Sequence, residues 1–157
     1  MDNAYNNKMV NAYINTPEKN DWYQNAFQKY HINDVDKIAW HWSWWALFGG
    51  FLFLLYRKAY IASLGLFILT AITSSIPILS LIVWIASGGL SVYFIYARYQ
   101  QKKKEIEASH DTEEACILEM QKIGGVHKWV IWLAVIINTI FLAYILFFLL
   151  AFSNYQP

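Results

Sequence analysis

The stretch HWSWWALFGGFLFLLYRKAY, residues 41–60, decides the fold, because fifteen uncharged residues, 42–56, precede Arg57 and Lys58. Fifteen helical residues reach about 22 Å at a rise of about 1.5 Å each, whereas a hydrocarbon core is about 30 Å thick. Tryptophan rings favour the headgroup layer, and four of them lie at the start of this stretch, Trp40, Trp42, Trp44 and Trp45. The pattern predicts a short interfacial or re-entrant aromatic helix over 41–58, anchored by these tryptophans and by the Arg57–Lys58 pair.

Two longer runs without Asp, Glu, Lys or Arg follow, at 59–97 and at 129–152. The chain is 57% hydrophobic and 18% aromatic, well above the average for a soluble protein. The second run has the length of one membrane span, and Pro77 near the middle of the first run suggests two spans joined by a tight turn. The sequence therefore predicts an all-α integral membrane protein with three transmembrane helices, at 59–76, 78–97 and 129–152.

The basic residues indicate the orientation of these spans. The twelve Lys and Arg residues fall into three groups, with four in 1–40, two at Arg57 and Lys58, and six in 98–128. If the aromatic helix does not cross, all three groups share one side, which the positive-inside rule identifies as cytoplasmic. We therefore expect a multi-pass protein with a cytoplasmic N-terminus and with its C-terminus outside.

The polar segments are expected to form small cytoplasmic helices. Thr16 and Pro17 are typical of a helix start, and one aromatic face follows, at Trp22, Tyr23, Phe27 and Tyr30. That face either packs on neighbouring helices or the membrane surface, or receives a partner. The expected organisation is amphipathic helices in 1–40, the aromatic helix in 41–58, a hairpin in 59–97, a cytoplasmic helical segment in 98–128, a span in 129–152 and a tail in 153–157.

Small and polar residues mark places where helices can meet inside a membrane. Gly88 and Gly89 would let another helix approach closely, and Gly49 and Gly50 would permit a bend. Asn138 is the most polar side chain of the last span. An interhelical hydrogen bond from it would contribute about 1 kcal/mol, and a ligand or pore role is the alternative.

The aromatic helix carries an aromatic-Ala-x-Phe-Gly pattern followed by Tyr-Arg-Lys-x-aromatic, at Trp45, Ala46, Phe48, Gly49, Tyr56, Arg57, Lys58 and Tyr60. This pattern resembles the core of a bacterial family of small integral membrane proteins known as a domain of unknown function. The chain departs from the family pattern at Leu47, Gly50, Phe53 and Tyr96, where the family favours an aromatic residue, Pro, Trp and His. The resemblance covers about 38–126 and implies a bacterial inner (cytoplasmic) membrane location without a known activity.

Few side chains in the sequence suggest catalysis, ion transport, or metal or cofactor binding. The expected spans contain no Asp, Glu, Lys, Arg or His, which argues against proton-coupled pumps, and the single cysteine, Cys116, excludes a cysteine-only metal cage. A net charge of +1 gives no general argument for nucleic acid as a partner. His41 and His127, at the ends of membrane segments, are either axial haem ligands or two polar interface residues.

The first hypothesis is a non-enzymatic accessory, assembly or scaffold subunit without cofactor or metal. Its partners would be the lipid bilayer and a larger membrane protein complex, or further copies of itself. The alternative is a homo-oligomeric channel or small-solute transporter lined by Asn138 and by serine and threonine hydroxyls. A membrane enzyme or haem protein that uses His41 and His127 is the third hypothesis.

Overall fold

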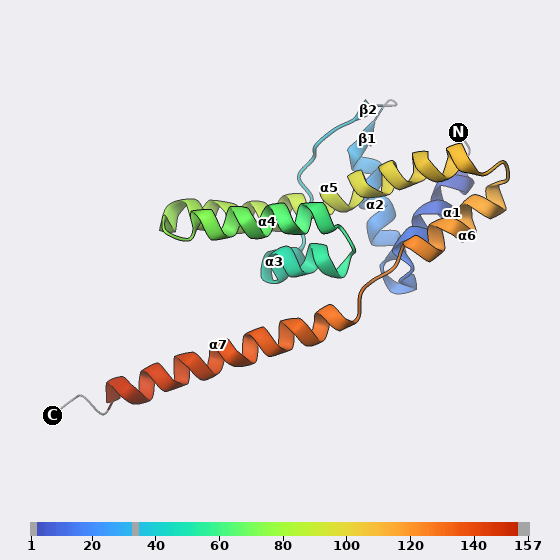
Figure 1. Cartoon of the computed structure of the whole chain (residues 1–157). Helices are drawn as coiled ribbons and strands as arrows, with labels where there is room; N and C mark the ends of the chain where they lie inside the picture. Colours follow the sequence, from blue (N-terminus) through green and yellow to red (C-terminus); the bar gives the residue numbers. More distant parts are fainter. Residues whose placement is uncertain (1–2, 33–34, 154–157) are drawn as a thin grey trace. The chain divides into compact units, whose positions relative to one another are not determined.

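The computed structural model describes residues 3–32 and 35–153, and the chain is mainly α-helical, as predicted (Figure 1). A short antiparallel ladder joins β1, His31–Ile32, to β2, Val35–Asp36. The described residues form one 3-10 turn, η1 Pro17–Lys19, and seven helices: α1 Asn3–Ile14, α2 Asn20–Tyr30, α3 Trp44–Tyr56, α4 Tyr60–Thr73, α5 Pro77–Ser109, α6 Glu113–Ile123 and α7 Trp129–Ser153.

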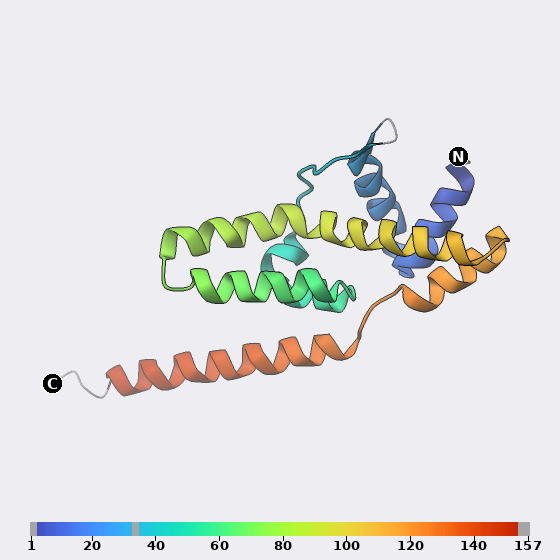
Figure 2. The ribbon, with the colours of Figure 1, turned by 45° about the horizontal axis from the view of Figure 1, so that its top comes forward.

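The chain divides into two compact units, 1–127 and 128–157. In the first unit, α4 and α5 form an antiparallel hairpin, and α3 packs against both of them (Figure 1). Helices α1, α2 and α6 gather around the C-terminal half of α5 (Figure 2). The second unit contains the single helix α7. The predicted tail lies outside the described residues from 154 onward.

Local sequence explains several helix ends. The Ser43 side chain accepts a hydrogen bond from the Ala46 backbone N–H at 3.3 Å and thereby caps α3. Thr112 caps α6 in the same way through the Ala115 N–H. Gly50, with φ of 50°, bends α3 in its middle, a conformation that glycine adopts without steric penalty.

Among the described residues, two helices and not three are long and apolar enough to cross a membrane, namely α5 and α7 over Trp129–Leu150. The predicted span at 59–76 was wrong, because α4 has only 14 residues and reaches about 21 Å. It begins late because Lys58 has a left-handed backbone, with φ of 61°, and it ends at the turn before Pro77. Helix α5 runs unbroken to Ser109, past the predicted boundary between 97 and 98.

Candidate functional site

The first candidate site is the corner between α3 and α4, where the predicted anchor residues Arg57 and Lys58 lie. Arg57 is only 7% exposed, and its Nη1 donates a hydrogen bond to the Ile14 carbonyl, the last of α1, at 3.1 Å. The guanidinium also lies over the Tyr23 ring, with its carbon 4.6 Å from the ring centroid. Arg57 thus joins α1 and α2 to the hairpin and is directed into the protein.

Lys58 makes the corresponding contact with a second helix end. Its ammonium donates hydrogen bonds to the Ile123 carbonyl at 3.4 Å and to the Gly124 carbonyl. A cation at these positions satisfies carbonyls that lack intrahelical partners and complements the helix dipole. Burial, and then the positive charge of Arg98, lower the pKa of Lys58. The two adjacent cations therefore cap the C-termini of two different helices.

Arg98 and Tyr60 complete this corner, although the sequence did not single them out for it. Arg98 donates from Nη1 to the Arg57 carbonyl at 3.3 Å and lies 5.5 Å from the centroid of the Tyr60 ring. The Tyr60 hydroxyl contacts His127 Nε2. Within the part of the chain that the structure describes, no carboxylate pairs with Arg57, Lys58 or Arg98. Their acceptors are mainly backbone carbonyls far away in sequence, which no local pattern reveals.

The second candidate site is the tryptophan segment, residues 40–43, directly ahead of α3. This extended segment lies along α5, where the His41 N–H donates to the Gly89 carbonyl at 3.0 Å and the Ser43 N–H to the Gly88 carbonyl at 2.9 Å. A Cβ atom on Gly89 would lie 2.2 Å from the Trp40 ring. The glycine pair thus receives an extended tryptophan segment of the same unit, whereas the sequence suggested a neighbouring helix.

The predicted anchor tryptophans lie at the surface. Trp44 and Trp45 are 63% and 74% exposed, Trp40 is also exposed and Trp42 is half-buried. The Trp42 ring contacts both Trp40 and Trp44, with centroids 6.3 and 5.3 Å apart. The Trp40, Trp42 and Trp44 rings thus form a continuous row, and the exposure of Trp44 and Trp45 suits contact with a membrane interface.

The aromatic face of α2 lies in the core of the first unit. Tyr23, Phe27 and Tyr30 are buried, and Phe27 packs edge-on against Tyr96 of α5 at 5.2 Å between ring centroids. Trp22 is half-buried, and its ring lies 4.7 Å from that of His41. These four residues pack within the chain, so they leave no aromatic groove on α2 for a partner.

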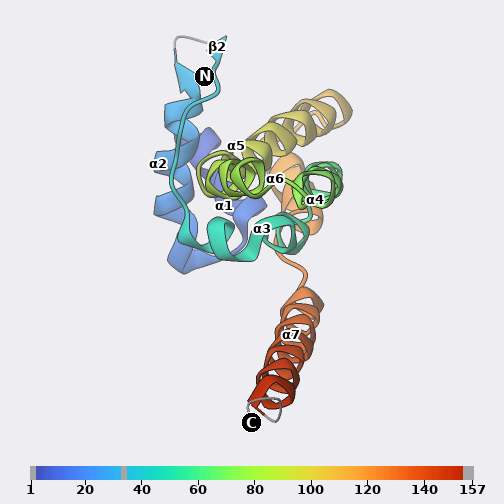
Figure 3. The same cartoon turned by 90° about the vertical axis from the view of Figure 1, so that its left-hand side faces the viewer.

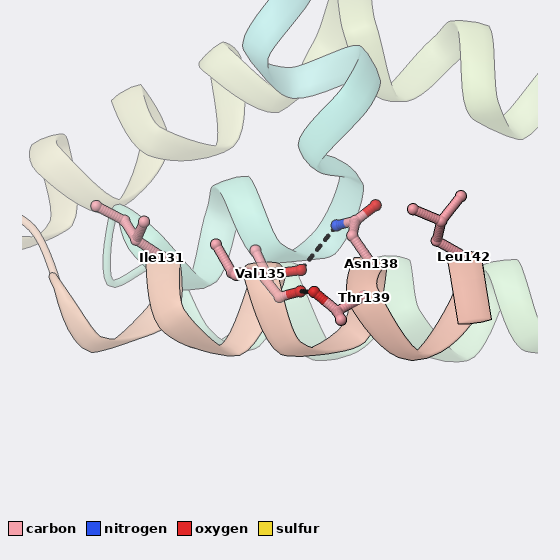
Figure 4. A pocket seen from close by; sticks show the side chains of 6 residues that line it. Ile131, Val135, Asn138, Thr139 and Leu142 are labelled. Atoms are coloured by element: carbon pink, nitrogen blue, oxygen red, sulfur yellow. Dashed lines mark hydrogen bonds between the residues drawn. The ribbon is translucent and has the colours of Figure 1, made fainter.

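Helix α7 carries the third candidate site, a shallow hollow around Asn138 (Figure 4). The Asn138 Nδ2 donates to the Ala134 carbonyl at 2.7 Å, and the Thr139 hydroxyl donates to the Val135 carbonyl at 2.8 Å. The Asn138 carboxamide oxygen accepts no hydrogen bond from any described residue. It therefore presents an unpaired acceptor on an apolar helix.

His41 and His127, the histidines of the haem hypothesis, have different aromatic neighbours. The His41 ring contacts Trp22, whereas the His127 ring lies 5.8 Å from that of Tyr60. Burial, and then the charge of Lys29, lower the pKa of His41. The haem hypothesis for these two histidines stays a prediction from the sequence.

A further hollow lies where α1 meets the junction of α5 and α6. The Glu107 carboxylate in it is 3.8 Å from the Lys103 ammonium, and no three His, Cys, Asp or Glu side chains among the described residues are grouped to hold a metal ion. The residues that line it are Tyr5, Glu107, His110, Asp111, Thr112, Glu113 and Cys116.

Comparison of the chain with protein-family models, curated proteins and solved structures finds no significant match. The resemblance to the bacterial membrane family therefore stays a prediction from the motif residues.

Proposed function

We propose that the protein is a non-enzymatic accessory, assembly or scaffold subunit of a bacterial inner membrane, and that α7 binds a larger membrane protein complex. The observation that carries this proposal is the unpaired Asn138 oxygen on α7. An unpaired polar group in hydrocarbon is unfavourable, and a donor on a partner helix would satisfy it. Such an interhelical hydrogen bond contributes about 1 kcal/mol.

The surroundings of Asn138 support the same role. Nothing within the second unit packs against α7, whose most apolar window is not buried by its own unit. Ala134, one turn before Asn138, is small and permits close approach of a neighbouring backbone. The aromatic face of α2 and the Gly88–Gly89 pair are occupied within the first unit, which leaves α7 as the element best suited to a protein partner.

In the proposed arrangement, residues 1–127 lie on the cytoplasmic side or enter the membrane from it, and α7 crosses outward. The distribution of Lys and Arg supports this orientation, because all twelve precede Trp129. The lipid bilayer is the second partner, through the exposed tryptophans near the start of α3.

The test is purification of the tagged full chain from its native membranes in a mild detergent, with identification and quantification of co-purifying proteins. We expect a stoichiometric membrane partner. The substitution Asn138→Ile should weaken its binding about tenfold, the equivalent of about 1.4 kcal/mol.

The matched control moves the amide to another face. The double variant N138I/I140N has the same composition as the natural chain but displaces the carboxamide by about 200° around the helix, and it should not restore binding. Thr139→Val should leave binding unchanged, because the Thr139 hydroxyl is already bonded to its own helix. If all three variants bound the partner as tightly as the natural chain does, Asn138 would have no role in binding. A purified particle that contains only this chain would favour the homo-oligomeric channel or transporter.

A further inference from the structure

The far end of the α4–α5 hairpin, residues 68–83, projects beyond the rest of the first unit, and we call it the apolar prong. Ring contacts between α3 and the hairpin occur at its root, where Phe51 lies 5.1 Å from Phe67 and Phe48 lies 6.4 Å from Trp84. Figures 1 and 2 both show α4 and α5 continuing together past α3 to their turn. The prong has no charged residue and no histidine.

The surface of the prong suits an apolar surrounding. Three of its five hydroxyl groups, those of Thr70, Thr73 and Ser74, donate hydrogen bonds to carbonyls of α4 itself, so these three need no water. Its large apolar side chains are exposed on both helices: Ile68, Leu69, Ile72, Ile76, Ile78, Leu79, Leu81 and Ile82.

The length of the prong matches one leaflet and not a whole bilayer. Seven residue steps separate Pro77 from Trp84, which corresponds to about 11 Å of helix. The hydrocarbon of one leaflet is about 15 Å thick, half of a core of about 30 Å. Exposed aromatic rings lie at the root of the prong, on Trp44, Trp45, Phe48 and Trp84. Aromatic belts of this kind lie at the headgroup level.

Polar parts of the first unit flank α5 directly beyond this aromatic belt. The His41 backbone is bonded to Gly89, and Trp22 at the start of α2 contacts the His41 ring. Helix α2 therefore lies beside α5 (Figure 3), and its ring contacts with Tyr93 and Tyr96 place it at the middle of that helix. Its outer face exposes Asp21 and Lys29. A hairpin that crossed completely would bring this charged face toward hydrocarbon, at a cost of about 3 kcal/mol per charge.

We infer that the α4–α5 hairpin enters only one leaflet of the bilayer, with the prong among the acyl chains and its turn near the bilayer centre. Helix α5 has the length of a span, but 39% of its most apolar window is buried within the protein, and only its first turns face lipid on the outside. The partner of this surface is the hydrocarbon of a single leaflet. The inference does not depend on the partner proposed for α7.

The test measures the depth of single nitroxide labels on the full chain in phospholipid vesicles, by comparing relaxation by oxygen with relaxation by a water-soluble nickel complex. Cys116 is the only cysteine, so Cys116→Ser provides the background for Ser75→Cys at the turn, Trp84→Cys at the belt and Lys102→Cys beyond it. We expect the label at 75 to be the deepest, the label at 84 to lie near the headgroups and the label at 102 to lie in water.

A complete crossing of the bilayer by the hairpin would reverse the relative depths of the labels at 75 and 84. The label at 75 would then be accessible to the nickel complex from the far side, and the label at 84 would be deeper than the label at 75. That result would overturn the inference, as would a label at 75 in water on the side of residue 102. A label on Ile140→Cys in α7 gives the depth of a crossing helix in the same vesicles, so failure of the inference is distinguishable from failure of the membrane to take up the protein.

Discussion

Arg57 is a buried cation that joins distant parts of the chain through a helix carbonyl and an aromatic ring. Hydrogen bonds from charged donors contribute about 1.5 to 3 kcal/mol each, and removal of one partner leaves the other without compensation. We therefore expect Arg57→Met, which keeps the apolar stem, to lower the free energy of unfolding by about 2 kcal/mol. Thermal unfolding in detergent micelles measures this change.

The control for Arg57 is Lys122→Met. Lys122 pairs with Glu119 on the surface, and its side chain is 72% exposed, so its removal should change stability by less than about 0.5 kcal/mol. If Arg57→Met left the unfolding midpoint unchanged and altered membrane insertion instead, Arg57 would be the membrane anchor that the sequence predicted.

The lowered pKa of His41 leads us to expect that the stability of the folded protein depends on pH. Its pKa is lowered in the folded protein by burial, and then by the charge of Lys29, from an ordinary value of 6.5, so the folded state favours the neutral ring. As pH falls below about 6.5, the unfolded chain binds a proton that the folded protein binds less readily, and stability decreases. The decrease ends below the folded-state pKa.

The measurement compares unfolding midpoints at pH 7.5 and 5.5. His41→Phe keeps a ring against Trp22 but cannot be protonated, so its midpoint should fall less than that of the natural chain over this interval. His110→Phe serves as the control variant. An equal decrease in the natural chain and in His41→Phe would assign the pH dependence to other groups.

The two basic residues at the corner show what could not be read from the sequence. Arg57 and Lys58 follow an apolar run, so a local pattern predicts anchoring at a membrane surface. Their acceptors include the carbonyls of Ile14, Ile123 and Gly124, which belong to helix ends more than forty residues away. Backbone carbonyls carry no residue-specific signal, and the role of the two cations emerges only from the tertiary fold.

At the scale of elements, the contact between α5 and the tryptophan segment depends on the absence of a side chain at Gly89. A methyl group there would overlap the Trp40 ring. We expect Gly89→Ala to displace the segment and to lower the free energy of unfolding by about 1 to 3 kcal/mol. The midpoint of thermal unfolding and the tryptophan emission spectrum measure the two effects.

Gly65→Ala is the matched control, because Gly65 also lies in a helix and a Cβ atom there would meet no other atom within 4 Å. Alanine exceeds glycine in helix propensity by about 1 kcal/mol, so this variant should be as stable as the natural chain or more stable. Equal effects at the two positions would mean that helix propensity, and not the approach of Trp40, determines the result at Gly89.

Most elements followed from sequence patterns, and the errors arose where tertiary contacts determine the outcome. The turn at Pro77 and the bend at Gly50 have local causes, so the sequence indicated both of them. The small-residue pair at Gly88 and Gly89 indicated close approach, but not that an extended segment would approach instead of a helix. The candidate site on α7 was predictable because an amide in a long apolar run is conspicuous in sequence.

At the scale of the whole molecule, the chain combines one unit that contains its own aromatic core with one that is a single apolar helix. If the apolar prong enters one leaflet, the first unit binds the membrane even when α7 is removed. We therefore expect a chain that ends at His127 to sediment with membranes, and to be extracted at alkaline pH more readily than the full chain, because a prong buries less apolar surface than a span.

Two matched substitutions on that shorter chain test where the membrane contact lies. Ile78 on the prong and Ile61 at the base of α4 are 75% and 89% exposed, so neither fills the core. Ile78→Lys should place a charge near the bilayer centre, at a cost of about 3 kcal/mol, and should shift most of the shorter chain to the soluble fraction. Ile61→Lys lies beyond the aromatic belt and should leave sedimentation unchanged. A hairpin that crosses completely would place both residues near headgroups, and then both variants would stay with the membrane.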